Sequence, residues 1–207
     1  MEPMEIVKGK VAPLFYENID TDQIIPAEYL KIITKKGLGR YLFYRWRYDN
    51  QDKPKRGFVL DEDQYSDATV LATGKNFGIG SSRENAVWAL QDFGIKAVIA
   101  PSYGDIFYGN AVKNGLLCVR IPEDNISEIQ ESAKKGNLIC EIDLVKQEIN
   151  TNRNHKIKFN IEQYVKERFM TGSDEITLTM TNLDKIKKYE SDIPKFLEVD
   201  MRSIFMQ

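Results

Sequence analysis

The sequence predicts an α/β fold, and three observations support that prediction. Apolar, strand-like runs alternate with segments of helical periodicity between residues 69 and 121. The connections between them are short, and a glycine follows each helical segment, at Gly94 and at Gly115. A strand–helix–strand–helix–strand order with short connections favours right-handed crossovers between parallel strands.

The N-terminal part is less regular than this core. Residues 6–15 suggest a first strand, and the polar residues after them indicate a turn. The expected elements, in chain order, are a strand over 6–15, a polar turn over 16–22, a short helix through Tyr29 and Leu30, a surface loop over 34–39, an aromatic run over 39–48 and a charged loop over 49–56. We expect the aromatic run to serve packing or partner docking, because RNA stacking would call for a basic chain.

The core elements follow from composition and spacing. Residues 69–73 are β-branched and aliphatic, as in a buried strand, whereas Ala86, Leu90 and Phe93 recur at helical spacing. Ser102 can cap a second helix, in which Ile106 and Ala111 are expected on one face. The expected elements are a strand over 69–73, a helix over 83–93, a strand over 96–100, a helix from Ser102 to Gly115 and a strand over 116–121.

The C-terminal part predicts a β-hairpin and helices. The expected elements are a helix over 125–135 ended by Gly136, strands over 138–145 and 156–161 on either side of a turn at 150–154, a helix over 162–170 and a helix near 183–190 in a charged tail. We therefore expect one domain over residues 1–170 and a C-terminal extension over 171–207 that is helical or partly irregular.

Composition excludes several classes of function. A net charge of −2 gives no electrostatic reason to expect binding to nucleic acid or to an acidic membrane surface. No apolar run approaches the ~18 residues of a membrane span, and the N-terminus does not resemble a signal peptide. We expect a cytoplasmic protein.

The counts of cysteine and histidine limit the chemistry of this chain. Cys118 and Cys140 lie far apart in apolar runs, and His155, the only histidine, lies in a polar turn. Two cysteines and one histidine cannot form a Cys₄, Cys₂His₂ or His₃ metal site, and we expect no Ser-His-Asp triad. We therefore expect no metal site on this chain.

The most informative segment is Gly-Lys-Asn-Phe-Gly-Ile-Gly-Ser-Ser-Arg-Glu at 74–84, which connects a strand to a helix. Ser81, Ser82 and Arg83 would stand at the helix N-terminus, where unpaired N–H groups favour a carboxylate, a phosphate or a serine alkoxide. The alternative is a turn that needs glycines for its backbone angles, with Ser82 as the helix cap. A dinucleotide fingerprint fits poorly because Arg83 stands where close helix–strand packing is needed, and no P-loop lysine is present.

Two long motifs carry a family resemblance. The runs at 20–27 (Asp-Thr-Asp-Gln-Ile-Ile-Pro-Ala) and 76–86, with the downstream run at 99–117, resemble the small subunit of 3-isopropylmalate dehydratase, the swivelling domain of the aconitase superfamily. The match extends in order to about residue 170. The resemblance implies a three-layer swivelling β/β/α domain with a parallel βαβαβ core.

The resemblance also implies a function. Small subunits of this family dock onto a large subunit that holds a [4Fe–4S] cluster, and the hetero-oligomer interconverts 2-isopropylmalate and 3-isopropylmalate by dehydration and rehydration in leucine biosynthesis. Ser81 matches the serine that acts as the base, Ser82 and Arg83 match contacts to the substrate carboxylate, and Asp22 matches an acidic residue that lines the site. Dehydration of a hydroxy acid needs a Lewis acid for the departing hydroxyl, and the cysteine and histidine counts place that metal on the partner.

The chain departs from the family pattern at two positions of this segment. Ile79 stands where cysteine is frequent, between two glycines, and Asn85 stands where histidine usually follows. If that histidine tunes the site, activity against pH should differ here from that of the family. If it only holds the start of the helix, the pH profile should be normal. We favour the second alternative.

Substrate preference is expected to depend on Lys31, Ile32 and Ile33, which fall where the family has its specificity loop. Either isoleucine could contact the isopropyl group of the small dicarboxylate substrate, whereas Lys31 would suit the extra carboxylate of a homoaconitate-like substrate. The alternatives are a related hydro-lyase acting on homoaconitate or a methyl-substituted malate, and a binding module for organic anions without catalysis. A helix end with no ligand contact is the structural alternative for these three residues.

Overall fold

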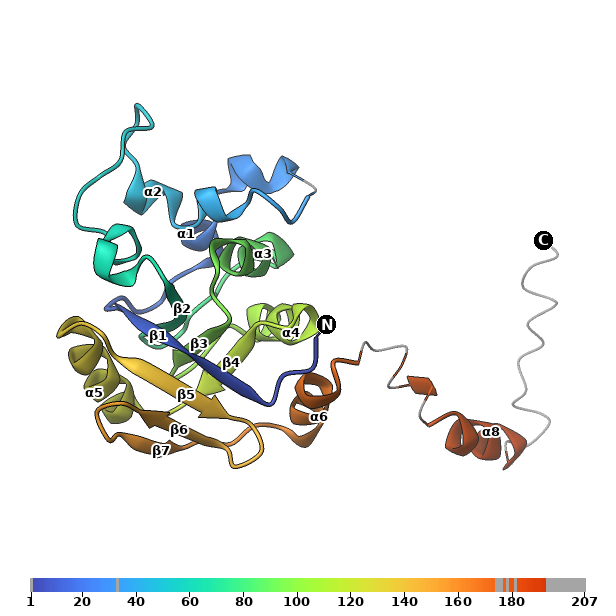
Figure 1. Ribbon diagram of the computed structural model, residues 1–207. Coiled ribbons are helices and arrows are strands. Elements are labelled where there is room, and N and C mark those ends of the chain that lie inside the picture. The colour runs from blue at the N-terminus through green and yellow to red at the C-terminus, as the bar shows by residue number, and fades with distance from the viewer. Residues whose placement is uncertain (1, 33, 174–176, 178, 181, 193–207) are drawn as a thin grey trace, which may run out of the picture. The chain divides into compact units, whose positions relative to one another are not determined.

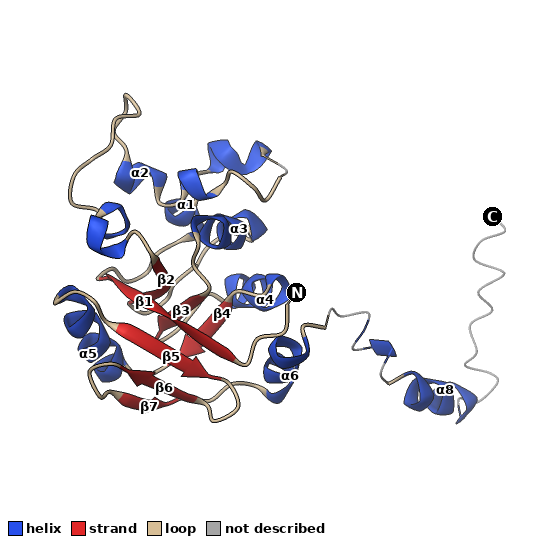
Figure 2. Ribbon diagram, viewed as in Figure 1, coloured by secondary structure: helices blue, strands red, loops and turns tan. Residues whose placement is uncertain are grey.

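The computed structural model describes residues 2–32, 34–173, 177, 179–180 and 182–192. The chain forms two compact units, residues 1–172 and residues 173–207. In the second unit the helix α8 spans Leu183–Asp192, where a helix is expected. The first unit contains the sheet and the remaining named elements, drawn in Figures 1 and 2.

One mixed sheet organises the first unit. Its strands are β1 (Ile6–Leu14), β2 (Ala68–Thr73), β3 (Ala97–Ala100), β4 (Leu117–Arg120), β5 (Ile139–Asp143), β6 (Glu148–Thr151) and β7 (Lys156–Lys158). The spatial order is β4-β3-β2-β1-β5-β6-β7. Strands β1 to β4 pair in parallel, and β5 to β7 pair antiparallel. The predicted α/β fold with a parallel βαβαβ core is confirmed.

Helices cover both faces of the sheet, and short helices cluster in the N-terminal part (Figure 1). The α-helices of the first unit are α1 (Thr21–Ile24), α2 (Tyr44–Arg47), α3 (Glu84–Phe93), α4 (Asp105–Asn114), α5 (Glu123–Lys134) and α6 (Gln163–Thr171). The 3₁₀ helices are η1 (Ala27–Lys31), η2 (Gly39–Tyr41), η3 (Val59–Asp61) and η4 (Asp63–Tyr65). Among the described residues, no helix is long and apolar enough to cross a membrane.

Strand alternation divides the interior into two cores. Leu71 of β2 and Val98 of β3 pack on the face covered by α3 and α4. Their neighbours Val70 and Ile99 point to the opposite face, which α5 and α6 cover. The sheet is therefore buried on both faces along its parallel strands, as the continuous apolar runs predict.

The structure corrects two expectations about the second helix of the core. Ser102 does not cap α4, because the helix begins after Gly104 and the Ser102 hydroxyl accepts a hydrogen bond from the Asn76 backbone N–H at 2.9 Å. Ile106 is 52% exposed, and Phe107 takes the buried position. Phe107 and Ala111 are four residues apart and share a helix face, whereas Ile106 and Ala111 are five apart and do not.

The expected turn at 150–154 is wrong in its first half, where residues of the range belong to strand β6. Ile149 is fully buried between two less buried neighbours, which is the alternation of a half-buried strand. The chain therefore forms two consecutive antiparallel pairs, β5 with β6 and β6 with β7, in place of one wide hairpin.

Candidate active site

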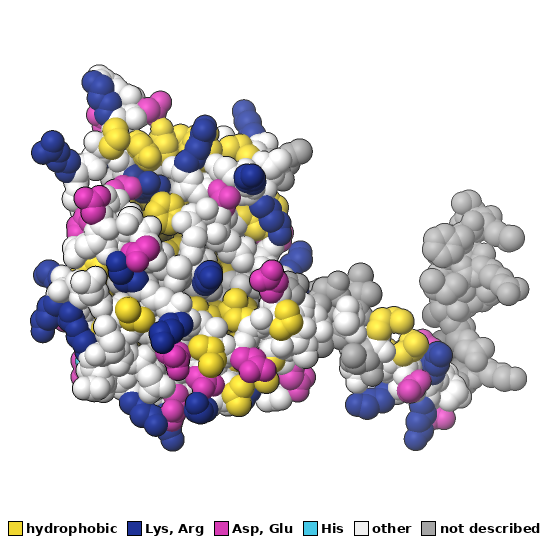
Figure 3. Space-filling model, viewed as in Figure 1, with side chains coloured by type: hydrophobic (Ala, Val, Ile, Leu, Met, Phe, Trp, Pro, Cys, Tyr) yellow, Lys and Arg dark blue, Asp and Glu magenta, His cyan; other side chains and the backbone are white. Residues whose placement is uncertain are grey.

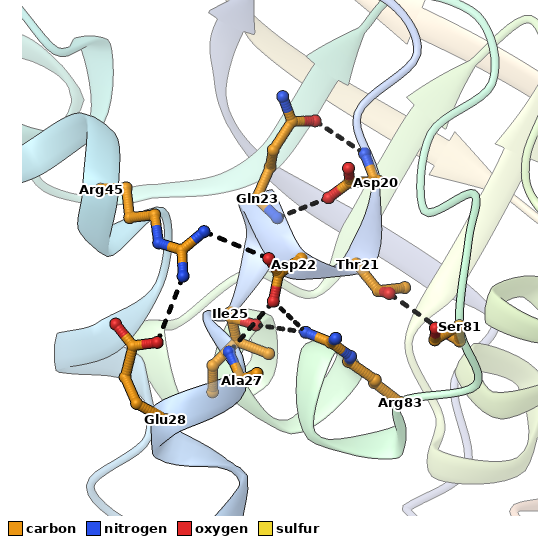
Figure 4. A network of polar contacts seen from close by, with 10 residues as sticks. All are labelled: Asp20, Thr21, Asp22, Gln23, Ile25, Ala27, Glu28, Arg45, Ser81 and Arg83. Atoms are coloured by element: carbon orange, nitrogen blue, oxygen red, sulfur yellow. Dashed lines mark hydrogen bonds and ion pairs between the residues drawn. The ribbon is translucent and has the colours of Figure 1, made fainter.

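The loop after β2 runs along the segment that follows β1. The N–H of Gly78 donates to the Ile19 carbonyl at 2.7 Å, and the N–H of Thr21 donates to the Ile79 carbonyl at 2.9 Å. The Thr21 hydroxyl then donates to the Ser81 carbonyl at 3.0 Å (Figure 4). These bonds join two motifs that lie about sixty residues apart in the sequence, and they place Ser81 beside α1.

Close packing and positive φ explain two of the glycines. Gly78 has a φ of +75°, and a Cβ there would lie 2.3 Å from Cγ of the buried Phe107. Gly80 has a φ of +94°. Only glycine adopts both conformations at low cost, so the glycines fix the path that leads to Ser81.

The exposed serines precede the first turn of α3. Arg83 occupies the N-cap position and makes no side-chain cap bond, so Ser82 does not cap the helix as the structural alternative supposed. Ser81 and Ser82 are exposed, next to the N–H groups that open a ten-residue helix. An anion at this position meets unpaired donors and the positive end of the helix dipole.

The Arg83 guanidinium is held through one of its nitrogens. Nη1 donates to Oδ1 of Asp22 at 2.5 Å and to the Ile25 carbonyl at 3.2 Å, and the side chain is 16% exposed. Within the described part of the chain, Nε and Nη2 donate to no acceptor. That edge of the guanidinium is the one that can form two parallel bonds with a carboxylate.

Both carboxylate oxygens of Asp22 are occupied. Oδ1 also accepts the N–H of Ala27 at 3.0 Å, and Oδ2 accepts Nη1 of Arg45 at 3.2 Å. Arg45 bonds Oε2 of Glu28 at 3.2 Å through its other terminal nitrogen (Figure 4). The hydrogen bond from Arg83 is the main cause that lowers the pKa of Asp22, and its charge and that of Arg45 act in the same direction. Asp22 therefore orients two arginines at this edge of the site.

The contribution of the Asp22–Arg83 ion pair to the stability of the fold should decrease as the pH falls. The pKa of Asp22 is lower in the folded chain than its unfolded value of about 3.9, so the pair stabilises the fold above that pH. We expect wild type to exceed Asp22→Asn in melting temperature near neutral pH. The difference should shrink as the pH falls below about 4 and the carboxylate is protonated.

Thermal denaturation of both proteins across this pH range measures the effect. Asp63→Asn, which changes an exposed carboxylate in η4, is the matched control. A difference between wild type and Asp22→Asn that stays constant or grows in acid would contradict the assignment.

Sequence reasoning missed Arg45 and gave Asn85 another role. Arg45 lies within the aromatic run on α2, and no local pattern predicts that it reaches Asp22. Nδ2 of Asn85 donates to the Ile32 carbonyl at 3.3 Å, so its amide contacts the segment after Leu30. This contact is a holding role that does not require a titratable side chain, so we keep the prediction of a normal pH profile.

The predicted specificity residues lie at and after the end of η1. Lys31 is the last residue of that helix and is exposed. Ile32 is partly buried and packs against the core that also contains α3. Ile33 lies outside the described residues.

The two thiols lie on different strands. Cys118 is on β4 and Cys140 is on β5, with β3, β2 and β1 between them in the sheet. Burial raises the pKa of both thiols, that of Cys140 to about 12. Their separation prevents joint ligation of an iron–sulfur cluster, and no group of three or more metal-ligating side chains occurs in the part of the chain that the structure describes.

The chain is similar to proteins of one family along nearly its whole length. The family model described as the aconitase C-terminal domain matches residues 1–124. The 3-isopropylmalate dehydratase small subunit of Bacillus subtilis (strain 168) is 43% identical over 198 residues, which are 96% of this chain and 100% of the relative. That of Oenococcus oeni is 44% identical over 197 residues, which are 95% of this chain and 100% of the relative.

A solved structure has the same fold. The crystal structure of a 3-isopropylmalate dehydratase from Methanocaldococcus jannaschii is 32% identical, with a TM-score of 0.63, and the match covers 88% of this chain and 99% of that one. The mixed sheet with helices on its faces therefore matches the predicted swivelling fold.

Proposed function

The chain belongs to the family of 3-isopropylmalate dehydratase small subunits, and we propose how its residues divide the work of this hydro-lyase of leucine biosynthesis. The reaction interconverts 2-isopropylmalate and 3-isopropylmalate by dehydration and rehydration. One observation carries the proposal: two exposed serines and an arginine with one unpaired edge meet at the N-terminus of α3.

Ser81 is the base in this proposal. It takes the proton from the carbon beside the substrate carboxylate and returns a proton to carbon during rehydration. A serine is a weak base unless its alkoxide is stabilised, and the first N–H groups of α3 together with Arg83 supply positive potential beside it. The hydroxyl leaves from the neighbouring carbon, and the partner's [4Fe–4S] cluster would supply the Lewis acid for that group.

Arg83 and Ser82 hold the substrate carboxylate. The unpaired Nε–Nη2 edge of Arg83 offers two parallel donors, and Asp22 and the Ile25 carbonyl fix the opposite corner of the same guanidinium. Asp22 contributes to substrate binding through this orientation. Its own charge is offset by Arg83 and Arg45, so that a dicarboxylate is not repelled.

The segment after η1 selects the substrate. Ile32 offers an apolar contact for the isopropyl group, and Ile33 is assigned the same role from the sequence alone. Lys31, exposed at the end of η1, is the residue that would favour an additional carboxylate. The balance between Lys31 and Ile32 therefore decides between isopropylmalate and a homoaconitate-like substrate.

The partner is the large iron–sulfur subunit, in a hetero-oligomer. Residues 1–170 are the swivelling domain that docks onto it, and residues 171–207 extend that domain. A mixed surface agrees with a protein partner in place of nucleic acid: on the face shown in Figure 3, basic and acidic side chains of the first unit are interspersed. We place the protein in the cytoplasm. Cys118 and Cys140 are free and buried, and the cytoplasm keeps thiols reduced.

A substrate series tests the proposed function. The chain is combined with its large subunit and assayed with 3-isopropylmalate, 3-methylmalate and homoisocitrate. We expect the highest kcat/KM for 3-isopropylmalate. A preference for homoisocitrate would assign the chain to a homoaconitase, and binding of all three without turnover would identify a binding module.

A further inference from the structure

One face of α3 holds the chain that begins at Ile32, one of the three predicted specificity residues, and continues to Gly39. Asn85, Trp88 and Asp92 are spaced by three and four residues and therefore share a face of this helix. Each of them contacts a different part of residues 32–39. The helix that presents Arg83 at its N-terminus thus also supports this segment along its side.

Asp92 makes the strongest of these contacts. Its Oδ2 accepts the N–H of Gly37 at 2.8 Å and the N–H of Gly39 at 2.7 Å. A carboxylate in the last turn of a helix is disfavoured by the helix dipole, so these two bonds give a reason for its presence there. The approach is close, because a Cβ at Gly39 would lie 2.6 Å from the backbone nitrogen of Phe93.

Trp88 connects the middle of the segment to α4. Its Nε1 donates to Oδ1 of Asn114 at 2.9 Å, and Nζ of Lys35 donates to the same oxygen at 3.0 Å. The ammonium of Lys35 also lies 5.2 Å from the centroid of the Trp88 ring. Nδ2 of Asn114 donates to Oε1 of Glu84 at 2.7 Å, so the network returns to the residue that follows Arg83.

Asn85 fixes the start of the segment, because its amide bonds the Ile32 carbonyl. We propose that Asn85, Trp88 and Asp92 are positioning residues for substrate selection, because they set where Ile32 lies relative to the carboxylate grip at Arg83. The inference rests on the proposed function, in which Ile32 contacts the alkyl group. Because α3 carries both Arg83 and the residues that hold Ile32, it would fix the spacing between the site for the substrate carboxylate and the site for its alkyl group.

Asp92→Ala tests the inference, in the complex with the large subunit. Hydrogen exchange at the amides of Gly37 and Gly39 reports whether the segment is released. The ratio of kcat/KM for 3-isopropylmalate to that for 3-methylmalate reports selection of the alkyl group. We expect faster exchange at both glycines and a ratio that falls about tenfold, since each methylene in an apolar pocket contributes about 10- to 200-fold.

Two further variants separate positioning from folding. Asp92→Asn keeps one carbonyl oxygen that can accept both N–H groups, and should retain most of the selectivity. Glu131→Ala, which removes an exposed carboxylate from α5, should change neither readout. If Asp92→Ala does not fold, Asn85→Ala removes the bond to the Ile32 carbonyl, and the same fall in the ratio is expected.

The possible outcomes distinguish failure of the positioning role from failure of the proposed function. Faster exchange at Gly37 and Gly39 with an unchanged selectivity ratio would overturn the positioning role while leaving the proposed function intact. Wild-type complex that turns over neither substrate would overturn the proposed function itself, whatever the exchange data show. An Asp92→Asn variant whose selectivity ratio falls as far as that of Asp92→Ala would overturn the inference, because the hydrogen bonds to Gly37 and Gly39 would then not be what sets selectivity.

Discussion

Ser81→Ala is expected to lower kcat for isopropylmalate isomerisation by about 10²- to 10⁴-fold, with a much smaller change in KM. Ser81 is exposed just before the first turn of α3, and the proposal assigns the substrate carboxylate to Arg83 and Ser82, so loss of the Ser81 hydroxyl should remove proton transfer and leave binding. Steady-state kinetics of the complex with the large subunit measure both constants. Thermal denaturation verifies that the variant is folded.

Ser82→Ala is the matched control, because it removes the same group from the adjacent exposed residue. Ser82 is assigned to the carboxylate, so its loss should raise KM by about 10- to 100-fold, as expected for one hydrogen bond to a charged group, with a smaller change in kcat. A Ser81→Ala enzyme of undiminished kcat, or a Ser82→Ala enzyme with the larger fall in kcat, would contradict the assignment of the base.

Arg83→Lys is expected to raise KM by about 10- to 100-fold, with a smaller effect on kcat. Lysine keeps the positive charge but loses the planar fork, so one of two parallel bonds to the carboxylate is lost. A hydrogen bond to a charged group contributes about 1.5–3 kcal/mol, which corresponds to this range. The measurement is KM for 3-isopropylmalate in the complex.

Arg45→Lys provides the comparison for Arg83. Arg45 also bonds Asp22, but it is 55% exposed and its other partner is Glu28. Its replacement should raise KM by less than Arg83→Lys does, because it acts only through Asp22. Equal effects of the two substitutions would mean that both arginines bind substrate directly.

Much of the core and of the loop at 74–84 follows from local sequence. Gly94 and Gly115 end α3 and α4 in the left-handed conformation, as their positions after helical periodicity predict. The buried strands β2 and β3 follow from apolar runs of strand length. These features can be predicted from the sequence because each depends on residues that are close together in the chain.

The features that sequence reasoning missed depend on contacts between distant residues. Arg45 reaches Asp22 only because α2 packs beside α1. Ser102 bonds Asn76 because the ends of two parallel strands meet at one edge of the sheet. The role of Asn85 toward Ile32 requires the segment after η1 to return across α3. No local pattern encodes such distances, whereas the family resemblance predicts that Asp22, Ser81 and Arg83 belong to one site.

We propose that this chain supplies half of an active site, and complementation with the large subunit tests this proposal. Isomerisation of 2-isopropylmalate is measured with this chain alone, with the large iron–sulfur subunit alone, and while one is titrated with the other. We expect no turnover from either component and activity that rises to a plateau at a fixed stoichiometry. Turnover by this chain alone, or by the large subunit without it, would contradict the account.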